Sequence, residues 1–148
     1  MNAEEVYVDP SALCRLYLNQ PGLREMSAWR RRTGGSLPVT HHGRTEIVNA
    51  ICRAAFAGQL DDEHLAAALA DVEDDFAVGR LHQADILWRA ALNRAADLSR
   101  GHTPVLGTRA LDVLHVACAL ELKLRHFLTF DDRQRKLATA VGLKTIKL

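Results

Sequence analysis

The stretch TRALDVLHVACALELKLRHFLTFD, residues 108–131, places an apolar helix, a short strand and an acid in direct succession. Residues 110–122 are mostly apolar, and a helix of that kind must be nearly enclosed by the rest of the protein. We expect Thr108 to cap this helix at its N-terminus. Residues 127–129 are typical of a strand, and Asp131 comes two positions later. A central helix next to a strand indicates a layered α/β domain.

The rest of the chain alternates between strand and helix patterns. Gly101 and Pro104 are expected to end the helix that starts at residue 85, and residues 77–85 fit either a loop or a short strand. The other predicted strands are residues 6–8, 37–40 and 144–146, and the other predicted helices are residues 10–18, 23–32, 43–56, 61–76, 85–100 and 131–141. Strands separated by helices pair in parallel through right-handed crossovers. We therefore expect residues 1–148 to form a single α/β domain, a small parallel sheet flanked by helices in three layers (α/β/α).

The composition is that of one globular domain. The chain has 148 residues, of which 48% are hydrophobic and 25% charged. No run approaches the roughly 18 apolar residues of a membrane span, and the N-terminus lacks a signal-peptide pattern, so we expect a cytoplasmic protein without a membrane partner. Cys14, Cys52 and Cys118 lack metal-site spacing and are expected to be buried thiols. A net charge of +1 neither supports nor excludes RNA binding.

Four acids occupy corresponding places in the predicted elements. Asp9 and Asp131 each follow a predicted strand, Glu46 lies in the opening turns of the helix after the second strand, and Asp112 lies in the first turns of the apolar helix. In parallel sheets the ligand crevice lies outside the carboxyl ends of the strands. We therefore expect these four carboxylates to converge there.

A cluster of carboxylates favours a bound cation. Two carboxylates about 4 Å apart repel by roughly 4 kcal/mol at an effective dielectric constant near 20. Oxygen donors favour Mg²⁺ or Mn²⁺, and we expect no cysteine or paired histidine near these acids with the spacing that zinc requires. Such an ion generates hydroxide from bound water and neutralises the charge that develops when a phosphodiester is cleaved. The acids therefore predict phosphodiester hydrolysis.

The four predicted site acids lie in four sequence segments whose order along the chain is characteristic. These segments are YVDPSALCRLY (7–17), TEIVNAI (45–51), RALDVLHVACALEL (109–122) and FLTFDDRQRKLA (127–138). Together they resemble the motifs of PIN domains, and most closely those of the VapC toxins of bacterial toxin–antitoxin modules. The resemblance extends from Val6 to about Ile146. It implies a metal-dependent endoribonuclease that hydrolyses RNA, a cognate antitoxin as protein partner, and a homodimer.

The resemblance also implies roles for individual residues. It assigns metal binding, with Mg²⁺ or Mn²⁺ as cofactor, and catalysis to the acids Asp9, Glu46, Asp112 and Asp131. Ser11 and Thr129 match small hydroxyl residues that often assist at such sites. Asp132 is adjacent to Asp131, and either acid can approach the metal at a loop-to-helix junction.

Other residues near the acids have both structural and functional interpretations. His115, one turn beyond Asp112, can act as a general base, but such a histidine is more often a hydrogen-bonded core residue, and we favour that interpretation. The pair His41 and His42 is a weaker candidate still. Arg133, Arg135 and Lys136 follow Asp131 closely and are candidate contacts for substrate phosphates or for an acidic residue of an antitoxin.

Three rival functions share part of this pattern. A phosphoryl-transfer enzyme of the haloacid-dehalogenase type is expected to carry a second Asp two residues after the first, where this chain has Ser11. A non-catalytic nucleic-acid or partner-binding module can retain the fold, but the four intact acids argue against lost activity. A DNA-directed nuclease of the same fold is the third rival, because RNA is preferred over DNA here only through the resemblance.

Overall fold

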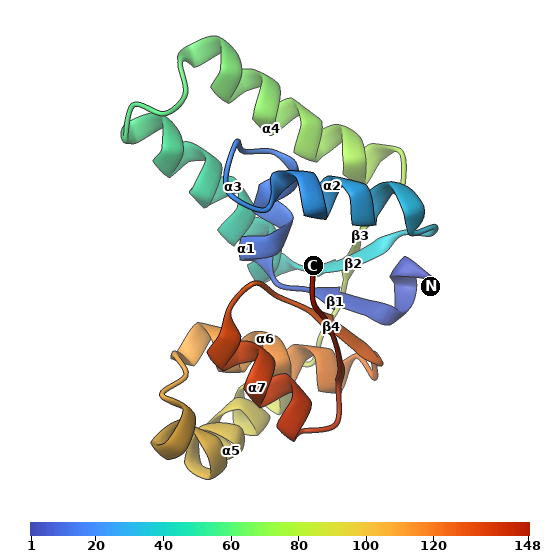
Figure 1. Ribbon diagram of the computed structural model, residues 1–148, viewed down its shortest axis with the longest axis vertical. Coiled ribbons are helices and arrows are strands. Elements are labelled where there is room, and N and C mark those ends of the chain that lie inside the picture. The colour runs from blue at the N-terminus through green and yellow to red at the C-terminus, as the bar shows by residue number, and fades with distance from the viewer.

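A computed structural model describes residues 1–148 without a gap (Figure 1). The strands are β1 (Val6–Val8), β2 (Leu37–Thr40), β3 (Leu81–Ala84), β4 (His126–Leu128) and β5 (Lys144–Ile146). The helices are α1 (Pro10–Leu13), α2 (Leu23–Arg32), α3 (His41–Phe56), α4 (Asp62–Ala77), α5 (Trp88–Leu106), α6 (Ala110–Glu121) and α7 (Asp132–Ala140). Short 3₁₀ turns cover Ala3–Glu5 and Cys14–Leu16.

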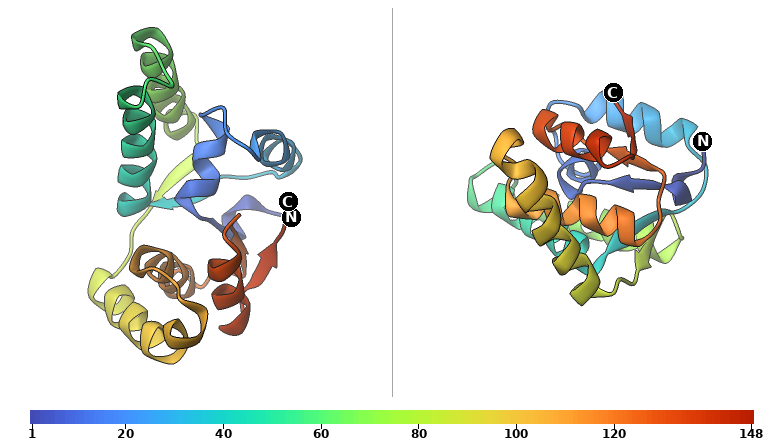
Figure 2. Two further views of the ribbon diagram at one scale, coloured as in Figure 1. Left: turned by 60° about the vertical axis from the view of Figure 1, so that its left-hand side comes forward. Right: turned by 90° about the horizontal axis from the view of Figure 1, so that it is seen from below.

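The strands form the middle layer of the molecule. β4 lies between β1 and β5 in a three-stranded sheet, β2 pairs with β3, and every pair is parallel. β1 also packs beside β2. Helices α1 to α4 lie on one side of the strands and α5 to α7 on the other (Figures 1 and 2). The predicted α/β class, parallel pairing and flanking helices are therefore confirmed.

Alternation along the strands divides the core between the two helical layers. Val6 and Val8 of β1 belong to the hydrophobic cluster beneath α1 to α4, whereas Tyr7 belongs to the cluster beneath α5 to α7. Leu128 and Phe127 of β4 divide in the same way. Successive side chains of a strand point to opposite faces, so a strand only three residues long contributes to both cores.

Helix α5 is longer than the sequence predicts. It runs through Gly101 and Pro104 to Leu106, and the residue that follows, Gly107, has a φ of 67°, the left-handed conformation common at helix ends. Pro104 removes the hydrogen bond to the carbonyl of Arg100. Arg100 and Pro104 are both exposed, so water can donate a hydrogen bond to that carbonyl. The expected end of the helix at Gly101 and Pro104 is therefore wrong.

Two further local predictions are corrected, and one open alternative is decided. Thr108 does not cap α6: Arg109 is the N-cap, and the Thr108 hydroxyl bonds to that of Thr103 at 2.8 Å. Cys14 and Cys118 are buried as expected, but Cys52 is exposed on α3. Residues 77–85, for which the sequence predicts either a loop or a short strand, contain the strand β3. Only the two ends of β3, Leu81 and Ala84, are buried, which explains its weak apolar pattern. No helix is both long and apolar enough to cross a bilayer.

Candidate active site

Asp9 lies directly after β1 and is 4% exposed. Its backbone N–H donates to the carbonyl of Leu128 at 3.0 Å, which continues the β1–β4 pairing by one residue. Its carboxylate caps α1 by accepting from the Ser11 backbone N–H at 3.0 Å and from the Ser11 hydroxyl. The residue that the sequence placed at the strand end is therefore held rigidly, and Ser11 helps to hold it.

Gln134 of α7 links Asp9 to the other acidic segments. Its side chain is fully buried, and its Nε2 donates to Asp9 Oδ1 at 2.8 Å and to the Asp112 carbonyl at 3.2 Å. The Thr129 hydroxyl donates to Gln134 Oε1 at 2.6 Å. The Gln134 backbone N–H donates to the Asp131 carboxylate at 2.8 Å, which makes Asp131 the N-cap of α7. One side chain and its backbone therefore connect the ends of β1 and β4 with the start of α6.

Asp112 and Asp131 open onto a shared polar cavity of 390 Å³. The lining contains no hydrophobic residue and consists of Gly107, Thr108, Arg109, Asp112, Asp131, Asp132 and Arg133. Partial burial and the negative charges of Asp9 and Asp131 raise the pKa of Asp112 above its usual range. Three of the four expected acids thus lie near enough to influence one another, and two guanidinium groups stand at the same cavity.

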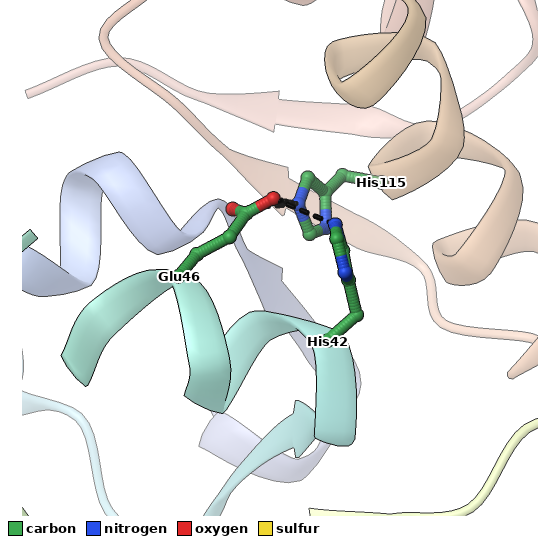
Figure 3. Close-up of side chains that lie close together, drawn as sticks. All are labelled: His42, Glu46 and His115. Atoms are coloured by element: carbon green, nitrogen blue, oxygen red, sulfur yellow. Dashed lines mark hydrogen bonds and ion pairs between the residues drawn. The ribbon is translucent and has the colours of Figure 1, made fainter. Parts of the chain in front are cut away.

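Glu46 has different neighbours. Its carboxylate lies 3.0 Å from Nε2 of His115 on α6 and 2.8 Å from Nε2 of His42, one turn earlier on α3 (Figure 3). Burial alone would raise the pKa of Glu46, but the hydrogen bond to His115 and the charges of both histidines lower it. Glu46 is thus part of a histidine cluster and does not line the polar cavity.

His115 is the hydrogen-bonded core residue that we favoured from the sequence, yet it also contacts a candidate site acid. It is 1% exposed, and its Nδ1 lies 2.6 Å from the Tyr7 hydroxyl. Burial alone would lower its pKa, but the hydrogen bond to Glu46 and the charges of Asp9, Glu46 and Asp112 outweigh burial and raise the pKa. The shifts of Glu46 and His115 have the signs of an ion pair.

The remaining candidate side chains differ in whether they are already paired with other protein groups. Asp132 is largely exposed and pairs with Arg135, and Arg135 also donates to the Thr129 carbonyl at 2.8 Å. Arg133 is exposed and lies at the cavity, with Nη1 3.4 Å from the Gly107 carbonyl. Lys136 is exposed one turn further along. Arg133 and Lys136 are therefore available to a ligand, whereas Arg135 is already engaged.

Comparison with known proteins decides the family. The profile of the PIN domain matches residues 6–140. This chain belongs to the PIN domain family. Its fold is similar to that in the crystal structure of FitAcB from Neisseria gonorrhoeae, with a TM-score of 0.64 and 15% identity over 96% of each chain. No curated protein sequence matches it.

Gln134, at the centre of this PIN domain, is not among the residues that the sequence singles out, and His42 is there only a weak candidate. Gln134 stands three positions after the N-cap Asp131, which is the spacing of a capping box, but its side chain bonds to Asp9, Asp112 and Thr129 and does not reach back to the cap. His42 precedes Glu46 by four residues on one helix, so both face the same way. The expectation that no paired histidine near the acids has the spacing that zinc requires was wrong, because His115 of α6 joins His42 and Glu46 in a group of possible metal ligands.

The buried amide of Gln134 generates a first prediction. Replacing it in Gln134→Leu leaves the Asp9 carboxylate and the Thr129 hydroxyl without a buried partner, so the free energy of unfolding should fall by about 1–3 kcal/mol. Urea denaturation measures the change. The control Gln59→Leu alters an exposed glutamine and should change stability by less than about 0.5 kcal/mol. Equal stability of the two variants would contradict the role of Gln134.

The Glu46–His115 pair generates a pH-dependent prediction. A raised His115 pKa contributes stability that is complete below the ordinary value of 6.5 and is lost as pH rises through the folded value. A lowered Glu46 pKa contributes stability that is present above the ordinary value of 4.5 and is lost as pH falls. In chelator-treated protein, Glu46→Gln should therefore cost most stability between these two values and less at alkaline pH.

Denaturation at several pH values tests this prediction. Glu73→Gln is the matched control, because Glu73 pairs with Arg44, which stays charged throughout that range. As pH rises from the ordinary pKa of histidine to alkaline values, the cost of Glu73→Gln should stay constant, because no histidine takes part in its ion pair. A cost of Glu46→Gln that is equally independent of pH would show that His115 and Glu46 are not coupled.

Proposed function

We propose that this PIN domain is a divalent-metal-dependent endoribonuclease in which Asp9, Glu46, Asp112 and Asp131 serve as catalytic metal ligands. The observation that carries the proposal is the polar cavity onto which Asp112 and Asp131 open, with Asp9 bound to the same segments through Gln134. Arg109 and Arg133 at this cavity supply positive charge for a phosphate.

The donor set fits Mg²⁺ or Mn²⁺. The raised pKa of Asp112 reflects burial and unneutralised negative charge nearby, and a cation there would relieve that repulsion. Asp9, Asp112 and Asp131 offer only carboxylate oxygens, which are the donors that hard cations prefer. Glu46 would join them by exchanging its contacts with His42 and His115 for the metal.

The chain's own residues would bind and orient the substrate. Arg109 and Arg133 would hold phosphate oxygens of single-stranded RNA, with Lys136 contacting the backbone further along. Gln134 keeps Asp9 fixed, and the cap of α7 does the same for Asp131. Bound metal would supply activated water and neutralise the charge that develops on the scissile phosphate. RNA is proposed over DNA on the strength of the motif resemblance.

Cleavage of labelled single-stranded RNA and DNA by the purified chain, with Mg²⁺, with Mn²⁺ and with chelator, tests the proposal. RNA should be cut only when a divalent ion is present. Asp9→Asn and Asp112→Asn should each lower the cleavage rate by roughly 100-fold or more, the scale expected when a group that stabilises transition-state charge is lost.

Asp97→Asn is the matched control, because Asp97 is an exposed acid on α5 that pairs only with Arg100. Its cleavage rate should equal that of the unmodified chain. RNA cleavage that persists in chelator, or in Asp9→Asn, would refute the proposed metal site. Cleavage of DNA in preference to RNA would support the proposed metal site but contradict RNA as the substrate.

We further propose that this nuclease is the toxin of a toxin–antitoxin pair and acts as a homodimer. Support comes from the resemblance of the four ordered segments to the motifs of VapC toxins.

Co-expression tests the antitoxin. Production of the chain alone should arrest growth of a bacterial host, and co-production with the short protein encoded beside its gene should restore growth and yield a stable complex. Asp9→Asn should be harmless in the same host. Normal growth with the active chain alone, together with no complex, would refute the toxin assignment and leave the nuclease proposal standing.

A further inference from the structure

The cluster of His42, Glu46 and His115 has the composition of a transition-metal site. One ligand atom from each residue lies within 4.8 Å of the other two. His42 and Glu46 project from one turn of α3, and His115 projects toward them from α6, as Figure 3 shows. The two imidazole rings lie 5.6 Å apart and nearly parallel, at 27°.

His115 is oriented in the way that metal-binding histidines usually are. The Tyr7 hydroxyl holds Nδ1 at 2.6 Å, which leaves Nε2 directed at Glu46. A partner on the second ring nitrogen fixes the orientation and tautomer of a ligating histidine. Tyr7 is itself fixed, because its ring stacks on Phe127 with centroids 5.5 Å apart.

His42 contributes a nitrogen that has no hydrogen-bond partner. Its Nε2 is buried and lies 2.8 Å from Glu46 Oε1, yet the N–H direction does not align with that oxygen. The Trp88 ring packs against the imidazole edge-on at 6.2 Å. This nitrogen is therefore in ion-pair contact with Glu46 without an aligned hydrogen bond, and a cation in the cluster would be bound by the nitrogen and the carboxylate together.

The donor types select among cations. Two imidazoles and one carboxylate suit zinc and similar transition metals, whereas Mg²⁺ prefers oxygen donors. The histidine cluster and the acids at the polar cavity therefore favour different ions.

We propose that His42, Glu46 and His115 bind one Zn²⁺ ion in a site separate from the carboxylates of the polar cavity. The site shares Glu46 with the proposed catalytic set, so zinc would retain Glu46 in the histidine cluster and inhibit cleavage. That consequence rests on the proposed function, whereas zinc binding itself does not.

Isothermal titration of the untagged full chain with Zn²⁺ tests binding. A Cys52→Ser background removes the one exposed thiol. One Zn²⁺ should bind per chain, and excess Mg²⁺ should not displace it. His42→Asn and His115→Asn should each weaken binding by about 10–100-fold or more, and Tyr7→Phe, which loses the orienting hydroxyl, by about 10-fold.

His41→Asn is the matched control, since His41 is the exposed neighbour of His42 and lies outside the cluster. It should bind zinc as the parent does. Visible absorption of bound Co²⁺ gives an independent signature, which His42→Asn should abolish and His41→Asn should retain. Absence of zinc binding by the parent, or equal affinity in His42→Asn, overturns the proposal whether or not His115→Asn folds.

Discussion

The buried side-chain amide of Gln134 is the interaction on which the arrangement of the acids depends. It binds the carboxylate of Asp9 after β1, the backbone of Asp112 on α6 and the hydroxyl of Thr129 after β4. These segments are far apart in sequence and are brought together by parallel pairing of β1 with β4. A neutral amide can donate a hydrogen bond to a buried carboxylate without adding positive charge. The acids are therefore held close together with their negative charges unneutralised, and a cation bound there would be stabilised by those charges.

Glu46 is shared by the two proposed metal sites, which prefer different ions. It bonds to the imidazoles of His42 and His115 and lies outside the lining of the oxygen-rich cavity, and its lowered pKa favours the ionised carboxylate. If Glu46 is needed for cleavage, a metal that prefers imidazole would reduce activity without entering the cavity.

Strong local patterns predicted most of the fold. α2, β2 and β5 have the bounds that the sequence indicates, because apolar periodicity and glycine punctuation agree there. The predicted α5 was too short, because proline was taken to end the helix. In the structure Pro104 lies on the solvent-exposed side of α5, where the lost backbone hydrogen bond can be replaced by water. The acids could be placed near strand ends, but the roles of Gln134 and His42 depend on which residues of distant elements face each other. Only the spacings from Asp131 to Gln134 and from His42 to Glu46 carried a local signal.

A crystal structure grown with Mn²⁺, with the ion located by anomalous scattering, tests the proposed acidic metal site most directly. Mn²⁺ should appear at the polar cavity in contact with Asp112 and Asp131 and within reach of Asp9, and it should be absent from this position in Asp112→Asn crystals. Mn²⁺ bound only elsewhere, or at the same position and occupancy in Asp112→Asn, would contradict the assignment of these acids as metal ligands.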